Sequence, residues 1–334
     1  MSRSSRIHHV VALEQFDPAE AVRIAALADA AGFAGAVVSD RFQPWLPSQG
    51  NASFVWVVAG AIGQATGGEI TVSAVPGYRM HPAVVAQASA TLAALHPGRH
   101  RLLLSAGDAI DEHVVGGYWP EPRERAERLF EAGDVIRRLF SSAARGSDVR
   151  HSGDHFRLES SRLWSRGSPE VQVWAGGPAT ARRAGRTGQG IAVMAGPPER
   201  LAALLRAFRE GAAEHRGQGR GRGRATVHAQ VSWARTDGEA MENALRDWPM
   251  AGLRFPRGDI RSPFDVAQLA ARVGPDDIRS RIPVSADIGV HVDRIRSLLD
   301  LGFDSVHLHN VGRNQEQWIE RCAQDLLPAV EEGL

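Results

Sequence analysis

The residues best suited to chemistry lie in one short string, residues 39–45, which reads Ser-Asp-Arg-Phe-Gln-Pro-Trp. It places an acid (Asp40), a cation (Arg41) and an indole (Trp45) within six residues, directly after a β-branched run. Such a set can bind a planar heterocycle by hydrogen bonds and stacking. The alternative is a helix start, with Asp40 as its cap and Trp45 in the core. That alternative explains each residue separately but not their proximity.

Other acids and glycines follow short apolar runs in the same way. In a barrel of parallel strands the catalytic groups gather where the strands end, because the loops after the strands converge there. Any one of these positions is weak evidence, since loops are polar and glycine-rich anyway. Together they indicate one shared pocket. The residues at these ends are Glu14, Pro76-Gly77, Gly107-Asp108, Gly176-Gly177-Pro178, Gly196-Pro197 and His309-Asn310.

Eight β-branched runs recur along the chain, each followed by a helical pattern. Most runs are apolar at both odd and even positions, which is typical of strands covered on both faces. Alternation of strand and helix predicts a parallel sheet, and eight strands favour closure into a (β/α)8 TIM barrel. A doubly wound sheet is the alternative, but residues 13–17 hold no glycine-rich dinucleotide turn. The predicted strands are 7–13, 34–39, 69–75, 100–105, 171–175, 190–194, 226–233 and 305–309.

Two of the intervening helices carry clear end signals. Asp17-Pro18-Ala19-Glu20 reads as a cap, a first-turn proline and a carboxylate, and the apolar run ends at Gly32. Pro82 opens a second helix that ends before His96-Pro97-Gly98. Two stretches are longer than the connections of a plain (β/α)8 barrel require. Residues 141–169 predict a hairpin before the fifth strand, and residues 234–302 predict extra helices near the barrel mouth. We expect one domain over residues 1–334.

The composition indicates an ordinary globular protein. Hydrophobic residues make up 43% and charged residues 23%, which predicts a sizeable core. The formal net charge of +1 gives no reason to expect nucleic acid or a membrane as partner. The single cysteine, Cys322, excludes an internal disulfide framework, and residues 1–13 hold no apolar stretch of signal-peptide length. We therefore expect a cytoplasmic protein with a small-molecule substrate.

Two other functions are open from single motifs. His307 and His309 share one face of the last predicted strand, as the ligands of metal-dependent barrel hydrolases do. However, His8 and His9 lie at the opposite end of the barrel, so we expect no metal site. The glycine- and arginine-rich tract 217–224 could bind RNA through flexible cations. A solvated loop before the seventh strand explains it better.

Several strings together resemble one known family. Residues 39–45 and 78–87, with 107–112, Trp119-Pro120-Glu121 and 175–178, are similar to the luciferase-like barrel oxidoreductases. Within that family they are most similar to glucose-6-phosphate dehydrogenases that use the deazaflavin coenzyme F420. The similarity continues to the last strand, residues 303–312, and so covers nearly the whole chain. It implies a homodimeric barrel with the deazaflavin ring deep in its mouth. The alternative coenzyme is FMN, which many family members use as monooxygenases.

The resemblance assigns roles by position. It places Asp40 beside the ring, and it implies a non-prolyl cis peptide between Val72 and Ser73 behind the ring face. It places Glu14, Trp45 and Asp108 toward the substrate. The remaining coenzyme contacts that it implies are Ala106, Gly107 and Asp111 at the ring edge, and the amides of Ala175, Gly176 and Gly177 at the ribityl and phosphate part.

Three departures from the family pattern bear on the reaction. Arg41 stands where the relatives have a histidine that takes the alcohol proton, and arginine cannot serve as that base. Asp108 stands in place of a glutamate. In the phosphate site a lysine becomes Pro197 and a threonine becomes Met194, while Arg257 and Arg281 keep two of three cations.

These departures shape the expected reaction. We expect an F420-dependent hydride-transfer oxidoreductase, with Arg41, Asp108, Glu14 and Trp45 at the reacting centre. Without the histidine, reduction of an electrophilic C=C, C=N or C=O in a biosynthetic intermediate is favoured. A dehydrogenase of a sugar 6-phosphate or another alcohol is the alternative, as is an FMN monooxygenase.

Overall fold

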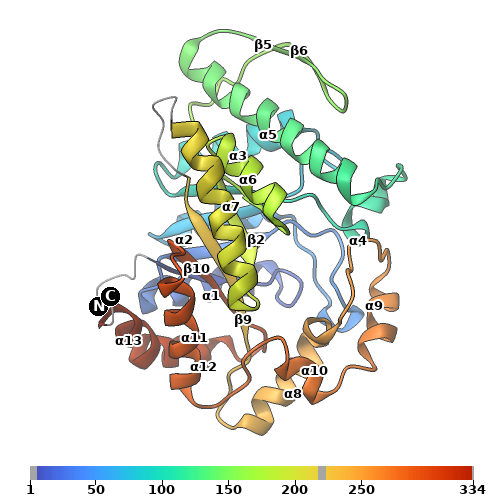
Figure 1. Cartoon of the computed structure of the whole chain (residues 1–334). Helices are drawn as coiled ribbons and strands as arrows, with labels where there is room; N and C mark the ends of the chain where they lie inside the picture. Colours follow the sequence, from blue (N-terminus) through green and yellow to red (C-terminus); the bar gives the residue numbers. More distant parts are fainter. Residues whose placement is uncertain (1–5, 217–222, 333–334) are drawn as a thin grey trace.

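Eight parallel strands close into a barrel in the computed structural model, which describes residues 6–216 and 223–332. Around the barrel the order is β1-β10-β9-β8-β7-β4-β3-β2 (Figure 1). The predicted (β/α)8 barrel is confirmed. Its strands are β1 (Ile7–Val10), β2 (Gly35–Ser39), β3 (Glu69–Ala74), β4 (His100–Leu104), β7 (Glu170–Trp174), β8 (Gly190–Met194), β9 (Ala225–Val231) and β10 (Ser305–Asn310).

The helices of the outer layer begin and end where the sequence signals stand. The carboxylate of Asp17 accepts from the amides of Ala19 and Glu20 at 2.9 and 3.0 Å. The helix behind it ends at Gly32, whose φ of +100° is one that glycine adopts readily. The outer helices are α1 (Pro18–Ala31), α2 (Val55–Ala65), α3 (Pro82–Leu95), α5 (Pro122–Arg145), α6 (Pro178–Arg186), α7 (Pro198–Arg216), α11 (Ile288–Asp300), α12 (Gln315–Arg321) and α13 (Leu327–Glu332).

Both predicted insertions are present. Strands β5 (Val149–Ser152) and β6 (Arg157–Ser161) form an antiparallel hairpin that lies beyond α5 at the top of Figure 1. The second insertion surrounds the barrel mouth with short helices. They are α8 (Asp237–Asp247), η3 (Pro249–Gly252), α9 (Pro263–Ala270) and α10 (Pro275–Arg279), and further short turns are η1 (Pro47–Gln49), α4 (Ala109–Glu112), η2 (His113–Val115) and η4 (Cys322–Leu326).

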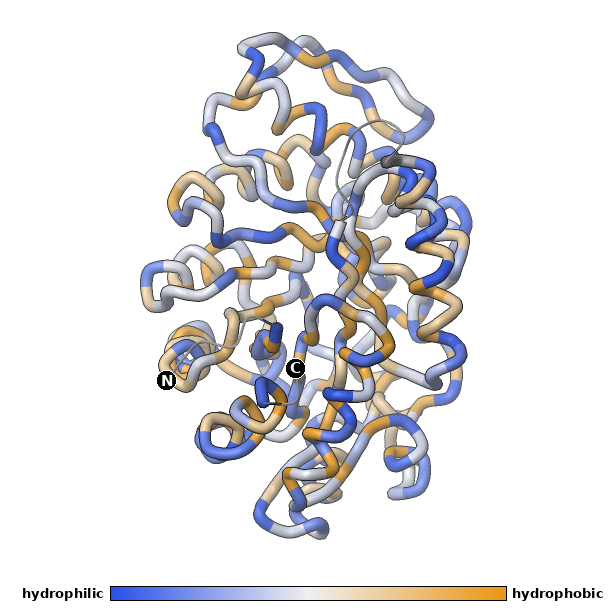
Figure 2. Tube along the Cα trace, turned by 60° about the vertical axis from the view of Figure 1, so that its left-hand side comes forward, coloured by the Kyte–Doolittle hydropathy of each residue, from blue (hydrophilic) through white to orange (hydrophobic). Residues whose placement is uncertain are grey.

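The core has two parts. The larger fills the space between the strands and the outer helices, and the hydrophobic segments run through the middle of the molecule in Figure 2. The smaller lies beneath α8 and α10 and includes Trp45, Trp248 and Ile278. The second cluster fixes the mouth insertion to the loop after β2, which is the loop that carries Asp40 and Arg41.

Two predicted strands end two or more residues earlier than expected. Strand β1 ends at Val10 rather than at residue 13, because the chain turns at Ala12, whose carbonyl accepts from the amide of Gln15 at 3.0 Å. This turn places Glu14 in a loop above the barrel. Strand β9 ends at Val231 rather than at residue 233.

No helix among residues 6–216 and 223–332 is long and apolar enough to cross a membrane. Most of the glycine- and arginine-rich tract, residues 217–222, lies outside the described residues, as does the start of the chain, residues 1–5.

Candidate active site

A cavity of about 380 Å³ opens at the carboxyl ends of the barrel strands. Residues in or directly after each of the eight strands line it. It therefore lies where the strand-end acids and glycines were expected to meet. Of the predicted site residues, Glu14, Asp40, Arg41, Trp45, Ser73, Gly107, Asp108, Asp111, Ala175, Gly176 and Arg257 line this cavity.

Asp40 lines this cavity, and one of its carboxylate oxygens has no partner in the described part of the chain. Its Oδ2 accepts from Nη2 of Arg79 at 2.7 Å, whereas its Oδ1 is buried and has no hydrogen-bond partner among the described residues. Burial raises the pKa of Asp40, and Arg79 opposes that rise. A buried acceptor without a partner is costly. The oxygen is thus suited to accept from a ring N–H of a ligand. No helix starts at Asp40, so the capping alternative is wrong for this residue.

Arg79 is itself shared between two acids. Its guanidinium also pairs with Glu112 at 3.0 Å, and the Asp40 and Glu112 side chains are fully buried. Burial raises the pKa of Glu112 to about 7. Sequence reasoning did not single out this pair, although Arg79 and Glu112 both fall inside strings that carried the family resemblance.

Arg41 faces the cavity and is also held by acids. Its Nη1 donates to Asp111 at 2.6 Å and lies 3.5 Å from Asp108, and its Nε lies 3.4 Å from Glu14. The guanidinium carbon stands 4.2 Å from the ring centroid of Trp45. Although burial opposes it, the three carboxylates raise the pKa of Arg41. Its charge is therefore largely compensated inside the site.

Asp111 serves the loop as well as the cavity. Besides binding Arg41, it accepts from the backbone amides of Phe42 and Gln43 at 2.9 and 3.2 Å. Both of its tasks hold the 40–45 loop over the barrel. The carboxylate is only 4% exposed, so little of it reaches a ligand at the ring edge.

Arg257 differs from Arg41 in having no acid partner. Its Nη1 donates to the carbonyl of Met250 at 2.7 Å, and its guanidinium carbon lies 4.9 Å from the Trp45 ring centroid. Within the described chain no carboxylate lies within 4.0 Å of it, and burial lowers its pKa. An unpaired, partly buried guanidinium favours an anionic ligand group.

The structure corrects the expected second anion contact. Arg281 follows α10, is exposed, and does not line the cavity. Arg200 lines the cavity instead. Its Nη1 donates to the carbonyl of Met194 at 3.0 Å and its Nη2 to that of Gly176 at 3.2 Å. Its position in the first turn after β8 is the sequence signal that could have identified it.

The glycines after β4 and β7 leave room for a ligand. Gly107 has a φ of +81°, and a Cβ there would lie 2.8 Å from Val75, so only glycine fits. Nothing lies within 4 Å of a Cβ built on Gly176 or Gly177. Their amides donate to no protein acceptor in the described ranges, and α6 begins directly after them. Free amides at a helix N-terminus bind phosphate groups.

Three further predicted coenzyme residues do not line the cavity, and the expected cis peptide at one of them is absent from the described residues. Val72, Ala106 and Gly177 do not line the cavity themselves. The Val72–Ser73 peptide is trans, not cis. Val72 pairs with Val38 and Leu102, and the ladder continues through Ser73 on both sides, which requires a regular strand. The Oγ of Ser73 accepts from Nε1 of Trp174 at 3.0 Å.

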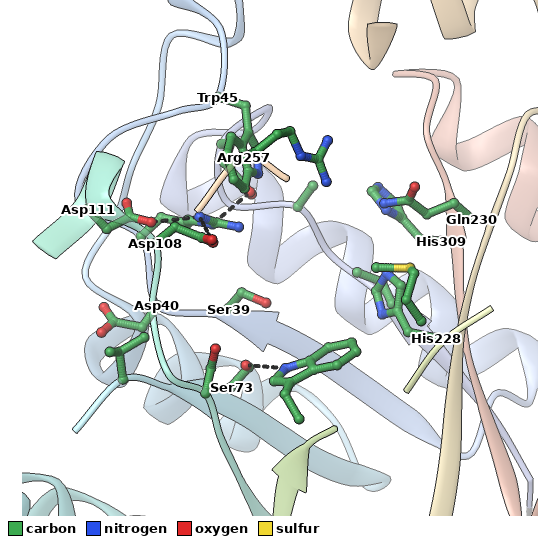
Figure 3. A pocket seen from close by; sticks show the side chains of 18 of the residues that line it. Ser39, Asp40, Trp45, Ser73, Asp108, Asp111, His228, Gln230, Arg257 and His309 are labelled. Carbon is green, nitrogen blue, oxygen red and sulfur yellow. Dashed lines mark hydrogen bonds and ion pairs between the residues drawn. The ribbon is translucent and has the colours of Figure 1, made fainter. Parts of the chain in front are cut away.

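A wall of uncharged polar side chains contains His309, which the sequence placed at a strand end of the pocket, and His228 and Gln230, which the sequence reasoning missed. Figure 3 shows His228, Gln230 and His309 across the cavity from Asp40 and Ser73. The ring of His309 packs edge-on against Trp248 at 4.7 Å between centroids. Burial lowers the pKa of His228 to about 4 and that of His309 well below its ordinary value, so both imidazoles are neutral. The signal was the alternation of polar residues in two otherwise apolar strands.

Fold and cavity together define a (β/α)8 barrel with a ligand site at the carboxyl ends of its strands. The luciferase-like monooxygenase family model matches residues 3–305, and the chain belongs to this family. It is 34% identical to an F420-dependent glucose-6-phosphate dehydrogenase of Intrasporangium calvum, with 95% of this chain and 96% of the relative covered. It is 32% identical to the enzyme of that name from Mycobacterium tuberculosis, with 97% and 98% covered.

Solved structures agree in fold. An F420-dependent secondary alcohol dehydrogenase in complex with an F420-acetone adduct matches with a TM-score of 0.89 and 28% identity, over 99% of both chains. The coenzyme F420-dependent tetrahydromethanopterin reductase of Methanopyrus kandleri matches with a TM-score of 0.78 at 19% identity, over 97% of this chain and 99% of the reductase. This second likeness concerns the fold alone.

Proposed function

We propose that the protein is a coenzyme F420-dependent oxidoreductase that interconverts an alcohol and a carbonyl group of a small molecule. The observation that carries the proposal is the placement of Asp40. Asp40 lines the cavity across from the neutral imidazoles of His228 and His309, and its Oδ1 is buried without a partner among the described residues. One side can thus hold a ring N–H and the other a hydroxyl. Relatives that are 32–34% identical over almost the whole chain are named F420-dependent dehydrogenases.

The residues present fit the coenzyme. Asp40 accepts from the heterocycle, Gly107 permits its close approach, and the free amides of Gly176 and Gly177 bind its phosphate. Arg200 stands beside Gly176 and adds a positive charge at this end. When bound, the deazaflavin supplies the hydride acceptor or donor.

The substrate end is formed by Trp45, Trp248, Arg257 and the histidine wall. Trp45 and Trp248 give apolar surface for the carbon skeleton, and Arg257 attracts an anionic group. A neutral imidazole can accept the hydroxyl proton as hydride leaves the carbinol carbon. The expectation of a reductase rested on the absence of a proton-accepting histidine at position 41. Because His228 and His309 line the same cavity, that argument no longer favours reduction over alcohol oxidation.

Oxidation is also favoured by the state of Arg41. Its positive charge already faces Glu14, Asp108 and Asp111, so little of it remains to stabilise a developing oxyanion. Two assays compare the directions: oxidation of the reduced coenzyme by carbonyl or unsaturated acceptors, and reduction of the oxidised coenzyme by alcohols. We expect activity with alcohol–carbonyl pairs. Activity confined to C=C or C=N acceptors would support the reductase instead.

The coenzyme itself is tested by titration. We expect the fluorescence of F420 to change on binding, and FMN to bind more weakly. Gly177→Val should weaken F420 binding about tenfold or more, because its side chain would occupy space beside the amide and block a phosphate contact worth roughly 1.5–3 kcal/mol. Gly238→Val in the first turn of α8, which also has open space, is the matched control and should bind normally. Tight FMN binding without a response to F420 would place the protein among the monooxygenases.

We also propose that the protein is a homodimer. Helices α2 and α3 contact one another and together contain no charged residue. Their outer positions include Val57, Val84 and Leu95, which are 70%, 49% and 58% exposed. Exposed apolar side chains on helices without charges are typical of an interface.

A further inference from the structure

The inside of the barrel carries a row of histidines below the cavity. Barrel interiors are normally filled by branched aliphatic side chains. Here His8, His307 and His228 occupy matching positions on the neighbouring strands β1, β10 and β9. His309 lies two residues further along β10, next to Gln230, and lines the cavity with His228.

The rings follow one another from the cavity to the far end of the barrel. Centroids of His309 and His228 are 5.9 Å apart, those of His228 and His307 6.4 Å, and those of His307 and His8 5.5 Å. The Nε2 of His8 lies 2.9 Å from Oε2 of Glu69. Glu69 is the first residue of β3, and its side chain is 24% exposed. The row, which we call the histidine column, thus joins the cavity to solvent at the amino ends of the strands.

The chemistry of the column suits proton movement better than packing. The Nδ1 atoms of His8, His228 and His307 and the Nε2 of His309 are buried and have no hydrogen-bond partner among the described residues. Burying such atoms costs free energy that an aliphatic core would avoid. A neutral imidazole both donates and accepts, so a proton can arrive at one nitrogen and leave from the other. A water molecule between neighbouring rings, where there is room for one, would complete the connection.

Among the residues that the structure describes, the charged groups named for the column stand at its two ends. At the far end Glu69 binds His8, Arg101 and Arg224. Although burial opposes it, the hydrogen bonds from Arg101 and His8 hold the pKa of Glu69 well below its usual range. At the cavity end the charged residues facing the column are Glu14, Asp40, Arg41, Asp108, Asp111, Arg200 and Arg257.

We propose that the histidine column is a proton path between the active-site cavity and Glu69. The proposal rests on the proposed function. In alcohol oxidation the C–H hydrogen leaves with its electron pair to the oxidised deazaflavin, the C=O bond forms, and the O–H proton passes to His309 or His228. The coenzyme and substrate fill the mouth, so this proton leaves through His307 and His8. In carbonyl reduction the same proton enters by this route.

His307→Leu tests the path, because His307 does not line the cavity. We expect unchanged F420 binding, a fall in kcat of roughly tenfold or more, and a larger solvent deuterium isotope effect on kcat. Added imidazole buffer should restore part of the rate, which a purely structural defect would not allow. His9→Leu is the matched control. Like His307, His9 is buried and does not line the cavity. It differs in lying edge-on against Phe33, outside the histidine column. It should keep the normal kcat.

Two further experiments test the path even if His307→Leu misfolds or the protein shows no turnover. His8→Gln keeps a donor for Glu69 but cannot relay a proton, and should reproduce the His307→Leu effect. In ¹⁵N-histidine NMR of the wild-type protein without coenzyme, the ring N–H groups of His228 and His307 should exchange with water about tenfold faster than that of His9.

The outcomes separate the two proposals. If the wild type turns over no alcohol or carbonyl with F420, the proposed function fails, and the NMR comparison still decides the path. If the wild type is active and both column variants keep its kcat and isotope effect, the proton leaves through the mouth and the column is no path. Ring N–H exchange as slow as that of His9 would also overturn it.

Discussion

Among single residues, Arg41 and Arg257 show how the same side chain takes different roles within one cavity. Both guanidinium carbons lie within 5 Å of the Trp45 ring centroid, at 4.2 and 4.9 Å. Arg41 is surrounded by three acids, whereas Arg257 faces none within ion-pair distance in the described part of the chain. Arg41 therefore belongs to the framework of the site, and Arg257 remains available to a ligand.

Substitution of Arg257 should identify the charge of the substrate. Arg257→Met should raise KM roughly tenfold to hundredfold for a substrate with a carboxylate or phosphate, because it removes a charge-assisted contact of about 1.5–3 kcal/mol. For a neutral alcohol KM should change little. Steady-state kinetics with matched anionic and neutral alcohols measure the difference.

Arg281→Met is the control, since Arg281 is exposed and outside the cavity. It should leave both KM values unchanged. With Pro197 and Met194 at the positions where the family resemblance implies a lysine and a threonine, glucose 6-phosphate should be a poor substrate. Efficient turnover at micromolar glucose 6-phosphate, or a loss of affinity in Arg281→Met, would restore the phosphate site that the sequence predicted.

At the scale of elements, the packing of α6 on α7 holds in place the glycines that we propose bind the coenzyme phosphate. Gly185 of α6 lies against the backbone of Phe208 and Ala212, and Gly211 of α7 lies against the carbonyl of Arg182. Each glycine lets the other helix approach its backbone. The N-terminus of α6, with Gly176 and Gly177, is therefore positioned by a close helix–helix contact.

Gly211→Ala should separate these helices, because its Cβ would collide with the carbonyl oxygen of Arg182. We expect a loss of about 1–3 kcal/mol in the free energy of unfolding, measured by urea denaturation, and weaker F420 binding. Gly238→Ala, which meets nothing closer than 4.0 Å, should change stability little or raise it slightly. Equal stabilities of the two variants would show that α6 and α7 do not need this contact.

Elements were more predictable than the contacts between them. Local composition identified all eight barrel strands, the hairpin and the ends of α1 and α3, because apolar runs, capping residues and glycines act over a few positions. Arg41 contacts Asp108 and Asp111, which lie 67 and 70 positions further along the chain. Local patterns do not reveal such contacts. Likewise, polar residues alternate visibly in β9 and β10, but only the register of β1, β10 and β9 brings His8, His307 and His228 together.

On the scale of the whole molecule, surface charge is distributed unevenly. Helices α6 and α7 carry exposed ion pairs, including Arg182 with Glu210 and Glu214. Helices α2 and α3, on another part of the barrel's outer layer, carry no charged side chain over their full lengths. Burying apolar area contributes about 25 cal/mol per Å². We therefore place the proposed dimer interface on the uncharged face of α2 and α3.

Val57→Glu should therefore convert the proposed homodimer into a monomer. Val57 is 70% exposed, so a glutamate there leaves the fold of one chain intact but buries a charge in an interface, which costs several kcal/mol. Light scattering coupled to size-exclusion chromatography should give about twice the 36.0 kDa chain mass for the wild type and the single mass for the variant. Val290→Glu on α11, at a site that is 43% exposed, should remain dimeric. A wild-type protein that elutes as a monomer, or a Val57→Glu variant that stays dimeric, would exclude this face as the interface.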